Sequence, residues 1–413
     1  MHHPYPLSPT TGTISSDKVV GRLEEINHLK QLLEGQSVVL NDIRRMGKTL
    51  FLQKFAYLSI MNDEPNKAIY FMFQGTPNVQ SLTDVILNEL RSKGRHGWLS
   101  VGMHRCHELY NKLTGTKTSL KYNDVEFSFT LPQFETEWEA AFRACIEDLA
   151  DRQADKGERL TLIFDELPIM LWEWISTGKA ADAMAFLDLL RNIHYSLKDS
   201  DRIRFVFCGS IGMKVVLGKL KKDHRYTGEP LNYTVEYHLP PMSGNDAIFL
   251  CECLYLSDFE CDIADNRTTY FQQITEACNN LPYFINAVFS ICRTKHDGLL
   301  SAKTIEEAVK AILTDTGSAY DIFKQLDERL TTYYSSDQTK AMYGCLKLLA
   351  KAQEPMSEEA LKTQLSFDEH ETQNALNTLW QDELLARTFD ENDTRHFAFK
   401  YSLIKRWWKL NKA

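Results

Sequence analysis

The chain has 413 residues, of which 43% are hydrophobic and 25% are charged, and its formal net charge is −9. These values exclude a disordered chain and fit a globular protein of two or three domains. The acidic balance argues against a protein whose main task is to coat nucleic acid, because such binding needs an excess of Lys and Arg.

Targeting and membrane signals are not evident. No run of about 18 consecutive apolar residues predicts a transmembrane helix. Residues 1–16 are polar and lack the basic start and apolar run of a secretory signal. We therefore expect a cytoplasmic protein without membrane contact, beginning with a flexible tail at residues 1–18.

Residues 19–238 alternate between predicted strands and predicted helices. The strands are short apolar runs rich in β-branched and aromatic residues, at 38–40, 68–73, 160–164 and 203–208. The helices have apolar residues at helical spacing, at 23–33, 50–60, 79–91, 134–153 and 180–197. This alternation is typical of an α/β domain with a parallel sheet. An insertion at about 94–132 contains a predicted β-hairpin at 119–130.

The remainder of the chain predicts two smaller domains. Residues 239–334 hold only helical periodicity and predict an all-α domain, with helices at 247–256, 270–277, 282–292 and 305–313. Residues 335–413 predict a winged helix, because three helices precede a two-stranded hairpin. These elements are expected at 341–350, 357–365, 369–380 and 384–401, and Ser357 is expected to cap the second helix.

The segment from Asp42 to Thr49 predicts a phosphate-binding loop, because it joins a buried strand to a helix and contains Gly-Lys-Thr. Backbone N–H groups and a helix N-terminus attract phosphate at such a place. Gly47 allows close approach, Lys48 supplies charge to the β- and γ-phosphates, and Thr49 offers a hydroxyl to Mg²⁺. The loop is therefore expected to bind a nucleotide and Mg²⁺, with Met46 and Leu50 in the same loop and first turn.

One position of this loop departs from the usual pattern. The pattern G-x-x-x-x-G-K-[ST] has glycine where this chain has Asp42. An acid that faced inward there would repel phosphate. The alternative interpretation is therefore a helix N-terminus without a ligand.

Two further strand ends carry polar residues. Asp165 and Glu166 follow the strand at 160–164, and Ser210 follows the strand at 203–208. Ligands bind at the carboxyl ends of parallel strands, so Asp165 would hold Mg²⁺ and Glu166 would polarise the attacking water. Ser210 would contact the γ-phosphate or that water. The alternative for Asp165 and Glu166 is an inert acidic turn, and the alternative for Ser210 is a plain turn.

With these motifs in order, the chain resembles the AAA+/STAND-type P-loop ATPases, in particular the archaeal-type ATPase branch, from Val19 to Trp408. Residues 20–25 resemble its opening GRExE motif, which Orc1/Cdc6 initiators share, and residues 44–49 resemble RRxGKT. Residues 164–168 resemble its Walker B motif hDEhP, and residues 209–210 resemble its sensor-1 strand end. The insertion before the Walker B helix is also a feature of this branch.

The resemblance assigns roles to several residues. It implies Mg²⁺ coordination by Asp165, a catalytic base at Glu166, and Arg22 near the adenine. Pro282 would pack on the base or ribose from the helical lid, whose usual glycine is Asn280 here. Asn280 is compatible with a left-handed backbone.

The closing segment, residues 399–408, resembles the family's F-x-x-P-L-h-R-x-W, with Ser402 in place of the proline. Its Trp407 and Trp408 are expected to be core anchors. Arg44 and Arg45 leave two interpretations open. One of them contacts the γ-phosphate or an acid such as Asp42 or Glu166, or both are surface charges. The sequence identifies no arginine finger.

The winged helix bears on the choice of partner. A winged helix inserts its third helix into the DNA major groove, but residues 369–380 contain no Lys or Arg. We therefore favour an ATP-dependent molecular switch whose lid and winged helix are read by a protein partner or by self-association. DNA binding by an initiator-like or mobile-element ATPase is the alternative. A scaffold with a decayed nucleotide site is the third hypothesis, which rests on Asp42.

Overall fold

The computed structural model describes residues 3–10, 12, 14–79, 81–82, 85–86, 89, 138–197, 202–315 and 317–413. The predicted insertion at 94–132, with its hairpin at 119–130, lies outside these residues. The chain forms two compact units. We call Ile26–Asn41 with Phe51–His238 the sheet unit, and Met1–Glu25, Asp42–Leu50 and Leu239–Ala413 the helical unit. The boundaries predicted at residues 238 and 334 remain predictions.

The sheet unit contains a five-stranded parallel sheet with the strand order β2-β3-β4-β1-β5. Its strands are β1 (Ser37–Asn41), β2 (Asn66–Met72), β3 (Arg159–Asp165), β4 (Ile203–Cys208) and β5 (Thr234–His238). In the centre of the sheet, Val39 of β1 pairs with Phe207 of β4 and with Glu236 of β5. The predicted α/β class is confirmed, and all carboxyl strand ends share one edge.

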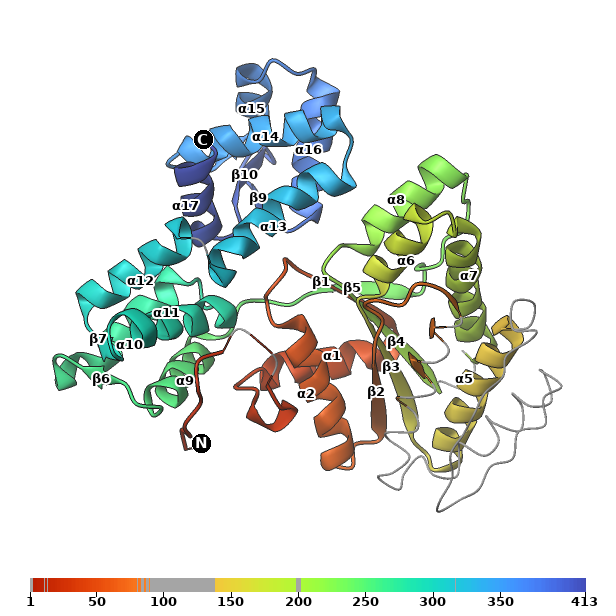
Figure 1. Cartoon of the computed structure of the whole chain (residues 1–413). Helices are drawn as coiled ribbons and strands as arrows, with labels where there is room; N and C mark the ends of the chain where they lie inside the picture. Colours follow the sequence, from red (N-terminus) through yellow and green to blue (C-terminus); the bar gives the residue numbers. More distant parts are fainter. Residues whose placement is uncertain are drawn as a thin grey trace. The chain divides into compact units, whose positions relative to one another are not determined.

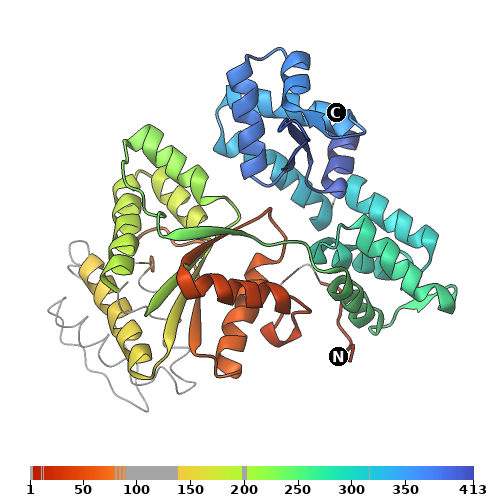
Figure 2. The same ribbon diagram turned by 180° about the vertical axis from the view of Figure 1, so that it is seen from behind.

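Helices cover both faces of this sheet. They are α1 (Leu23–Gly35), α2 (Lys48–Met61), α5 (Trp138–Asp155), α6 (Leu167–Ser176), α7 (Ala180–Leu197) and α8 (Met213–His224). Figures 1 and 2 show α5 to α8 on one side of the sheet and α1 and α2 on the other. The central strands β3 and β4 are accordingly buried and mostly apolar, and the rings of Phe164 and Phe205 lie 5.7 Å apart.

Three elements of this unit have no counterpart among the sequence predictions. The strand β5 lies at the sheet edge, where only Tyr237 of its five residues is buried, so it lacks the apolar run of a central strand. The helix α6 begins with Leu167 and Pro168, and proline is tolerated in the first helical turn although it suggests a loop. The helix α8 is the third, with Val216 and Leu220 on its buried side.

The first part of the helical unit is a bundle of helices. They are α9 (Gly244–Tyr255), α10 (Arg267–Ala277), α11 (Pro282–Lys295), α12 (Ala302–Thr314) and α13 (Ser318–Tyr333). Besides these helices, β6 (Glu260–Cys261) and β7 (Leu299–Leu300) form a short parallel pair that the sequence did not predict. Two-residue strands are too short for a sequence pattern.

The C-terminal part has the element order of a winged helix. Its helices are α14 (Ser336–Lys351), α15 (Glu358–Gln364), α16 (Glu369–Gln381) and α17 (Ser402–Asn411). The strands β8 (Met356–Ser357), β9 (Leu385–Phe389) and β10 (Arg395–Phe399) form an antiparallel sheet in the order β8-β10-β9. The Ser357 hydroxyl accepts a hydrogen bond from the Ala360 N–H at 3.1 Å, as expected of an N-cap.

The two tryptophans of α17 anchor the core, as predicted. Trp407 and Trp408 are each 1% exposed. The Trp407 ring stacks on Phe323 of α13, with centroids 5.4 Å apart. One apolar cluster runs through the bundle and the winged helix and includes Met46 of the predicted phosphate loop. Within the described ranges, no helix has the length and apolar character needed to cross a membrane.

Candidate functional site

The predicted phosphate loop lies between β1 and α2 and has a constrained backbone. Arg45 and Gly47 have φ angles of 71° and 86°, in the left-handed region. Single residues in that conformation are typical of anion-binding backbone turns. A Cβ atom at Gly47 would lie 3.7 Å from Cγ of Pro282, so the loop glycine and the lid proline are neighbours within the helical unit.

Lys48 is held inside the loop. Its side chain is buried, and Nζ donates hydrogen bonds to the carbonyl oxygens of Asp42 at 2.6 Å and Ile43 at 2.8 Å. The helix α2 begins at this residue. The ammonium is therefore close to the helix N-terminus, where partial positive charge already favours anions.

Asp42 has its own set of partners in the helical unit. Its Oδ1 accepts from the Ile43 N–H at 2.6 Å and from the Tyr401 hydroxyl at 3.4 Å. Its Oδ2 accepts from Lys400 Nζ at 3.0 Å. Burial raises the pKa of Asp42, and the charges of Lys400 and Lys48 oppose that rise.

Arg22 connects the loop to two other segments of the helical unit. Its Nη1 donates to Glu25 Oε1 at 2.8 Å and to the Pro240 carbonyl at 2.6 Å. Its Nη2 donates to the Met46 carbonyl at 3.3 Å. The Arg22 side chain is 4% exposed, and its guanidinium donates to three acceptors. Its predicted role near the adenine remains a prediction.

The other loop residues differ in their surroundings. The Arg45 guanidinium carbon lies 5.2 Å from the centroid of the Tyr283 ring on α11, within cation–π range. Met46 is fully buried, whereas Arg44, Thr49 and Leu50 are half-buried.

The turn at Asn279 and Asn280, which precedes Pro282 and α11, has the left-handed backbone that the sequence predicted at Asn280. Asn279 and Asn280 have φ angles of 52° and 54°, so Asn280 takes the left-handed conformation that a glycine would. The Asn279 Oδ1 accepts from the Leu403 N–H at 3.0 Å and from the Ser402 hydroxyl at 3.2 Å. This turn therefore binds the start of α17.

The sheet unit brings together Asp165, Glu166 and Ser210. Asp165 is 1% exposed, and its Oδ2 accepts from the Tyr70 hydroxyl at 2.7 Å. Burial and the nearby Asp165 carboxylate raise the pKa of Tyr70. Glu166 has a φ of 58°, and its Oε2 accepts from the N–H and the hydroxyl of Ser210 at 2.9 and 3.0 Å.

Each unit contains an oxygen donor of a kind that Mg²⁺ binds. Within the described residues, no three His, Cys, Asp or Glu side chains cluster as a metal cage. Mg²⁺ usually takes one or two protein oxygens together with phosphate oxygens and waters. The Thr49 hydroxyl in the helical unit and the Asp165 carboxylate in the sheet unit are each a donor of this chemical kind, and their shared role remains a prediction. The buried Lys48 ammonium matches the phosphate charge.

Sequence reasoning missed the residues around Asp42 and Asp165. Lys400 and Tyr401 lie 358 and 359 positions from Asp42, and Tyr70 lies 95 positions from Asp165. The closing motif that contains Lys400 is visible in the sequence. Its pairing with the phosphate loop has no local signal.

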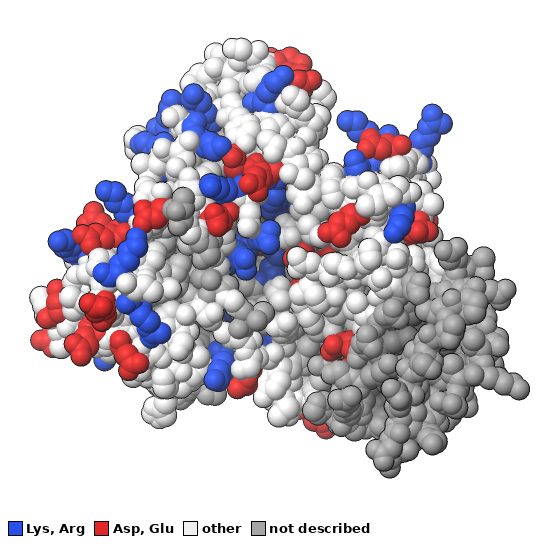
Figure 3. Space-filling model, in the orientation of Figure 1, with Lys and Arg blue, Asp and Glu red and all other residues white. Residues whose placement is uncertain are grey.

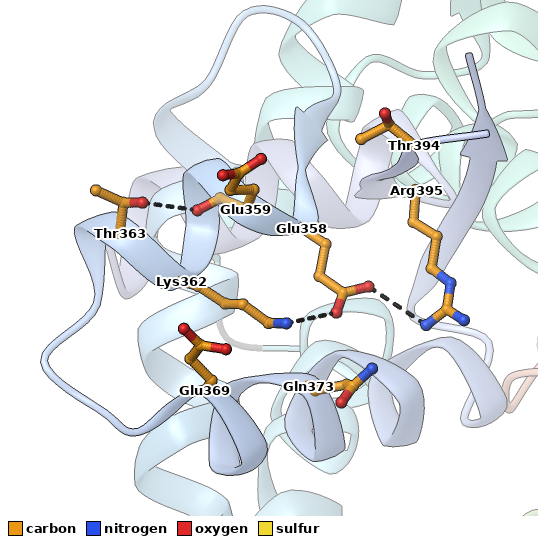
Figure 4. A pocket seen from close by; sticks show the side chains of 8 residues that line it. All are labelled: Glu358, Glu359, Lys362, Thr363, Glu369, Gln373, Thr394 and Arg395. Atoms are coloured by element: carbon orange, nitrogen blue, oxygen red, sulfur yellow. Dashed lines mark hydrogen bonds and ion pairs between the residues drawn. The ribbon is translucent and has the colours of Figure 1, made fainter. Parts of the chain in front are cut away.

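The winged helix has a hollow of about 580 Å³ between α15, α16 and β10. In Figure 4, Glu358 binds Lys362 and Arg395, with ion-pair distances of 3.0 and 3.4 Å. Glu369 and Gln373 of α16 line the opposite side. On the face drawn in Figure 3, Lys and Arg are interspersed with Asp and Glu. Neither the hollow nor this mixed surface charge favours contacts with the phosphates of nucleic acid.

Comparisons with known proteins give similarities to solved structures. No family model and no curated protein matches the chain. Aeropyrum pernix Orc1 in complex with DNA shares 12% identity, with 96% of this chain and 94% of that chain covered and a TM-score of 0.36. The Thermotoga maritima RuvB Holliday junction branch migration motor shares 11%, with 94% and 95% covered and a TM-score of 0.36.

A third structure, Drosophila ORC bound to AT-rich DNA and Cdc6, shares 8% identity, with 94% of this chain and 92% of that chain covered and a TM-score of 0.24. These proteins are AAA+ P-loop ATPases, the group that the sequence motifs resemble. At such low identities and TM-scores, the similarities do not by themselves assign a family or a function.

Proposed function

We propose that this chain binds ATP through the loop from Asp42 to Leu50, hydrolyses it, and transmits the nucleotide state to its lid and winged helix. One observation carries the proposal. The loop packs with the lid and the winged helix in a single compact unit, in which Gly47 neighbours Pro282 and Asp42 binds Lys400. A change of ligand at this loop would alter the packing of both parts.

Each loop residue has a defined task in this account. Lys48 would exchange its two carbonyl partners for phosphate oxygens, so the nucleotide takes over contacts that now close the loop. Gly47 keeps the backbone free of a side chain beside the phosphates. Arg22 fixes the loop through the Met46 carbonyl.

The Walker B residues supply the hydrolytic part of the proposal. They end β3, which lies two strands from β1, and the phosphate loop follows β1 in the chain. Asp165 and Thr49 would hold Mg²⁺, which when bound neutralises phosphate charge. Glu166 would accept a proton from the attacking water, and Ser210 orients its carboxylate.

Equilibrium binding of a fluorescent ATP analogue to the full chain tests the first part. Wild type and Lys303→Ala should bind, because Lys303 is an exposed lid residue with a side chain 83% accessible. Lys48→Ala should not bind. Binding by Lys48→Ala with wild-type affinity would contradict the proposal.

Steady-state hydrolysis tests the second part. Glu166→Gln should bind ATP but lose turnover, by a factor of about 100 or more. Glu173→Gln is the matched control, since Glu173 is exposed on α6. Binding without turnover in wild type would leave a nucleotide-stabilised scaffold. Stimulation of turnover by DNA would favour the initiator-like alternative.

A further inference from the structure

The residue that departs from the phosphate-loop pattern is also the one that the winged helix binds. The Asp42 side chain has no exposed surface, although it is a carboxylate. Buried carboxylates need a cation and hydrogen-bond donors, because desolvation of an unpaired charge is costly. The loop can therefore bury the Asp42 carboxylate only if a neighbouring residue supplies such a cation.

The cation comes from the turn after β10. Lys400 Nζ lies 3.0 Å from Asp42 Oδ2 and 2.5 Å from Glu383 Oε2. The Lys400 N–H donates to the Leu384 carbonyl at 3.0 Å, which holds the residue beside β9. Glu383 precedes β9 and has a φ of 64°. The Lys400 backbone is thus held beside β9, and its ammonium is shared by the carboxylates of Asp42 and Glu383.

A second cation acts on Asp42 in the present arrangement. The Lys48 ammonium lowers the pKa of Asp42, although burial has the larger, opposite effect. The proposed nucleotide would draw Lys48 toward phosphate. Lys400 would then be the principal cation left for Asp42, at the moment when polyphosphate charge arrives beside the loop.

We propose that Lys400 is a positioning residue for the phosphate loop, which neutralises Asp42 so that the loop accepts a nucleotide only while the winged helix is docked on it. This inference rests on the proposed function for its nucleotide part. Its other part, that the Asp42–Lys400–Glu383 bridge docks the winged helix on the loop, does not depend on nucleotide binding.

Affinity for the fluorescent ATP analogue is the first readout, on the full chain at about pH 8. Lys400→Met should bind at least about ten-fold more weakly than wild type, because it leaves a buried carboxylate unpaired beside the phosphates. Lys400→Arg should retain affinity. The double variant Asp42→Asn/Lys400→Met should recover most of it. Lys340→Met is the matched control, since Lys340 is 66% exposed on α14.

The pH profile separates charge compensation from loss of packing. For Lys400→Met, affinity should recover as pH falls from about 8 to about 5.5, because protonation removes the Asp42 charge. Wild type should not show this recovery. A structural defect alone would not be repaired by acid.

Amide hydrogen exchange without nucleotide is the second readout. Lys400→Met and Asp42→Asn should both speed exchange at residues 42–48, because both break the bridge. If ATP binds wild type and Lys400→Met equally, and fails to bind Lys48→Ala, the inference is overturned while the proposed function stands. If wild type binds no ATP, the proposed function fails. Equal exchange in wild type and Lys400→Met then overturns the docking part too.

Discussion

Glu166 and Ser210 are joined by two hydrogen bonds, because the Glu166 carboxylate accepts from both the N–H and the hydroxyl of Ser210. The pair links the end of β3 to the end of β4 within the sheet unit. Gly209 makes this approach feasible, since a Cβ there would lie 2.6 Å from Pro168. Ser210 was expected to contact the γ-phosphate or the attacking water. These hydrogen bonds give it a second candidate role, which is to orient the Glu166 carboxylate.

Removal of the Ser210 hydroxyl tests that role. Ser210→Ala should lower kcat by a factor of about 10 to 100, since a hydrogen bond to a charged group contributes roughly 1.5–3 kcal/mol. The affinity for ATP should stay within about two-fold, because the proposed contact of Glu166 is with the attacking water rather than with the phosphates. Ser210→Thr keeps a hydroxyl and should retain most turnover. An unchanged kcat with weakened binding would instead identify a phosphate contact.

Gly47→Ala tests the conformation of the phosphate loop. The φ of 86° would cost alanine about 1–2 kcal/mol, and the added methyl group would narrow the space beside Pro282. We expect lower stability in denaturant and loss of ATP binding. Gly35→Ala is the matched control, because Gly35 ends α1 with nothing near its Cβ position. Equal behaviour of the two variants would rule out a special role for Gly47.

Stability should depend on pH through Asp42. Burial raises its pKa, so the folded chain binds more protons than the unfolded chain between the ordinary Asp pKa of about 4 and the raised value. The free energy of unfolding should therefore fall as pH rises through that window. The charged or titratable side chains acting on Asp42 are Lys400, Lys48, Glu383 and Tyr401.

Asp42→Asn isolates this contribution. Burial lowers the pKa of Lys400, but Asp42 and Glu383 raise it more, so Lys400 keeps its charge throughout the window. The stability of Asp42→Asn relative to wild type should grow as pH rises above about 4, in chemical denaturation at several pH values. A difference between the two proteins that is constant with pH would mean that Asp42 titrates normally.

DNA binding should be weak and insensitive to salt. The helix α16 carries no Lys or Arg, and the hollow beside it presents Glu358 and Glu369. The turn between β9 and β10 adds Asp390, Glu391 and Asp393. Fluorescence anisotropy with duplex DNA should show no affinity that falls steeply with salt, because few phosphates would be neutralised. Salt-dependent binding would revive the initiator-like alternative.

Local patterns predicted much of the fold. The helix at 180–197 and the strand at 203–208 were predicted with the observed bounds, because both are strongly apolar and periodic. The edge strand β5 was missed, since all but one of its residues are exposed or half-exposed and it has no continuous apolar run. Gly47, Lys48 and Asp165 were predicted as site residues from short motifs, and their roles remain predictions.

Contacts between distant residues could not be predicted in the same way. Neither Lys400 nor Asp42 carries a local sequence signal of the other, yet they form a partly buried ion pair across 358 positions. Only packing of the winged helix on the loop creates that pair. Likewise, Tyr70 has the pattern of a strand residue, and its hydrogen bond to Asp165 follows from the pairing of β2 with β3.

The most direct measurement is amide hydrogen exchange of the full chain with and without ATP and Mg²⁺, for wild type and Lys48→Ala. The account predicts that ATP changes exchange at residues 42–50 and also at residues 383–401 in wild type, and at neither segment in Lys48→Ala. Protection confined to residues 42–50, with residues 383–401 unchanged, would contradict the coupling of nucleotide state to the winged helix.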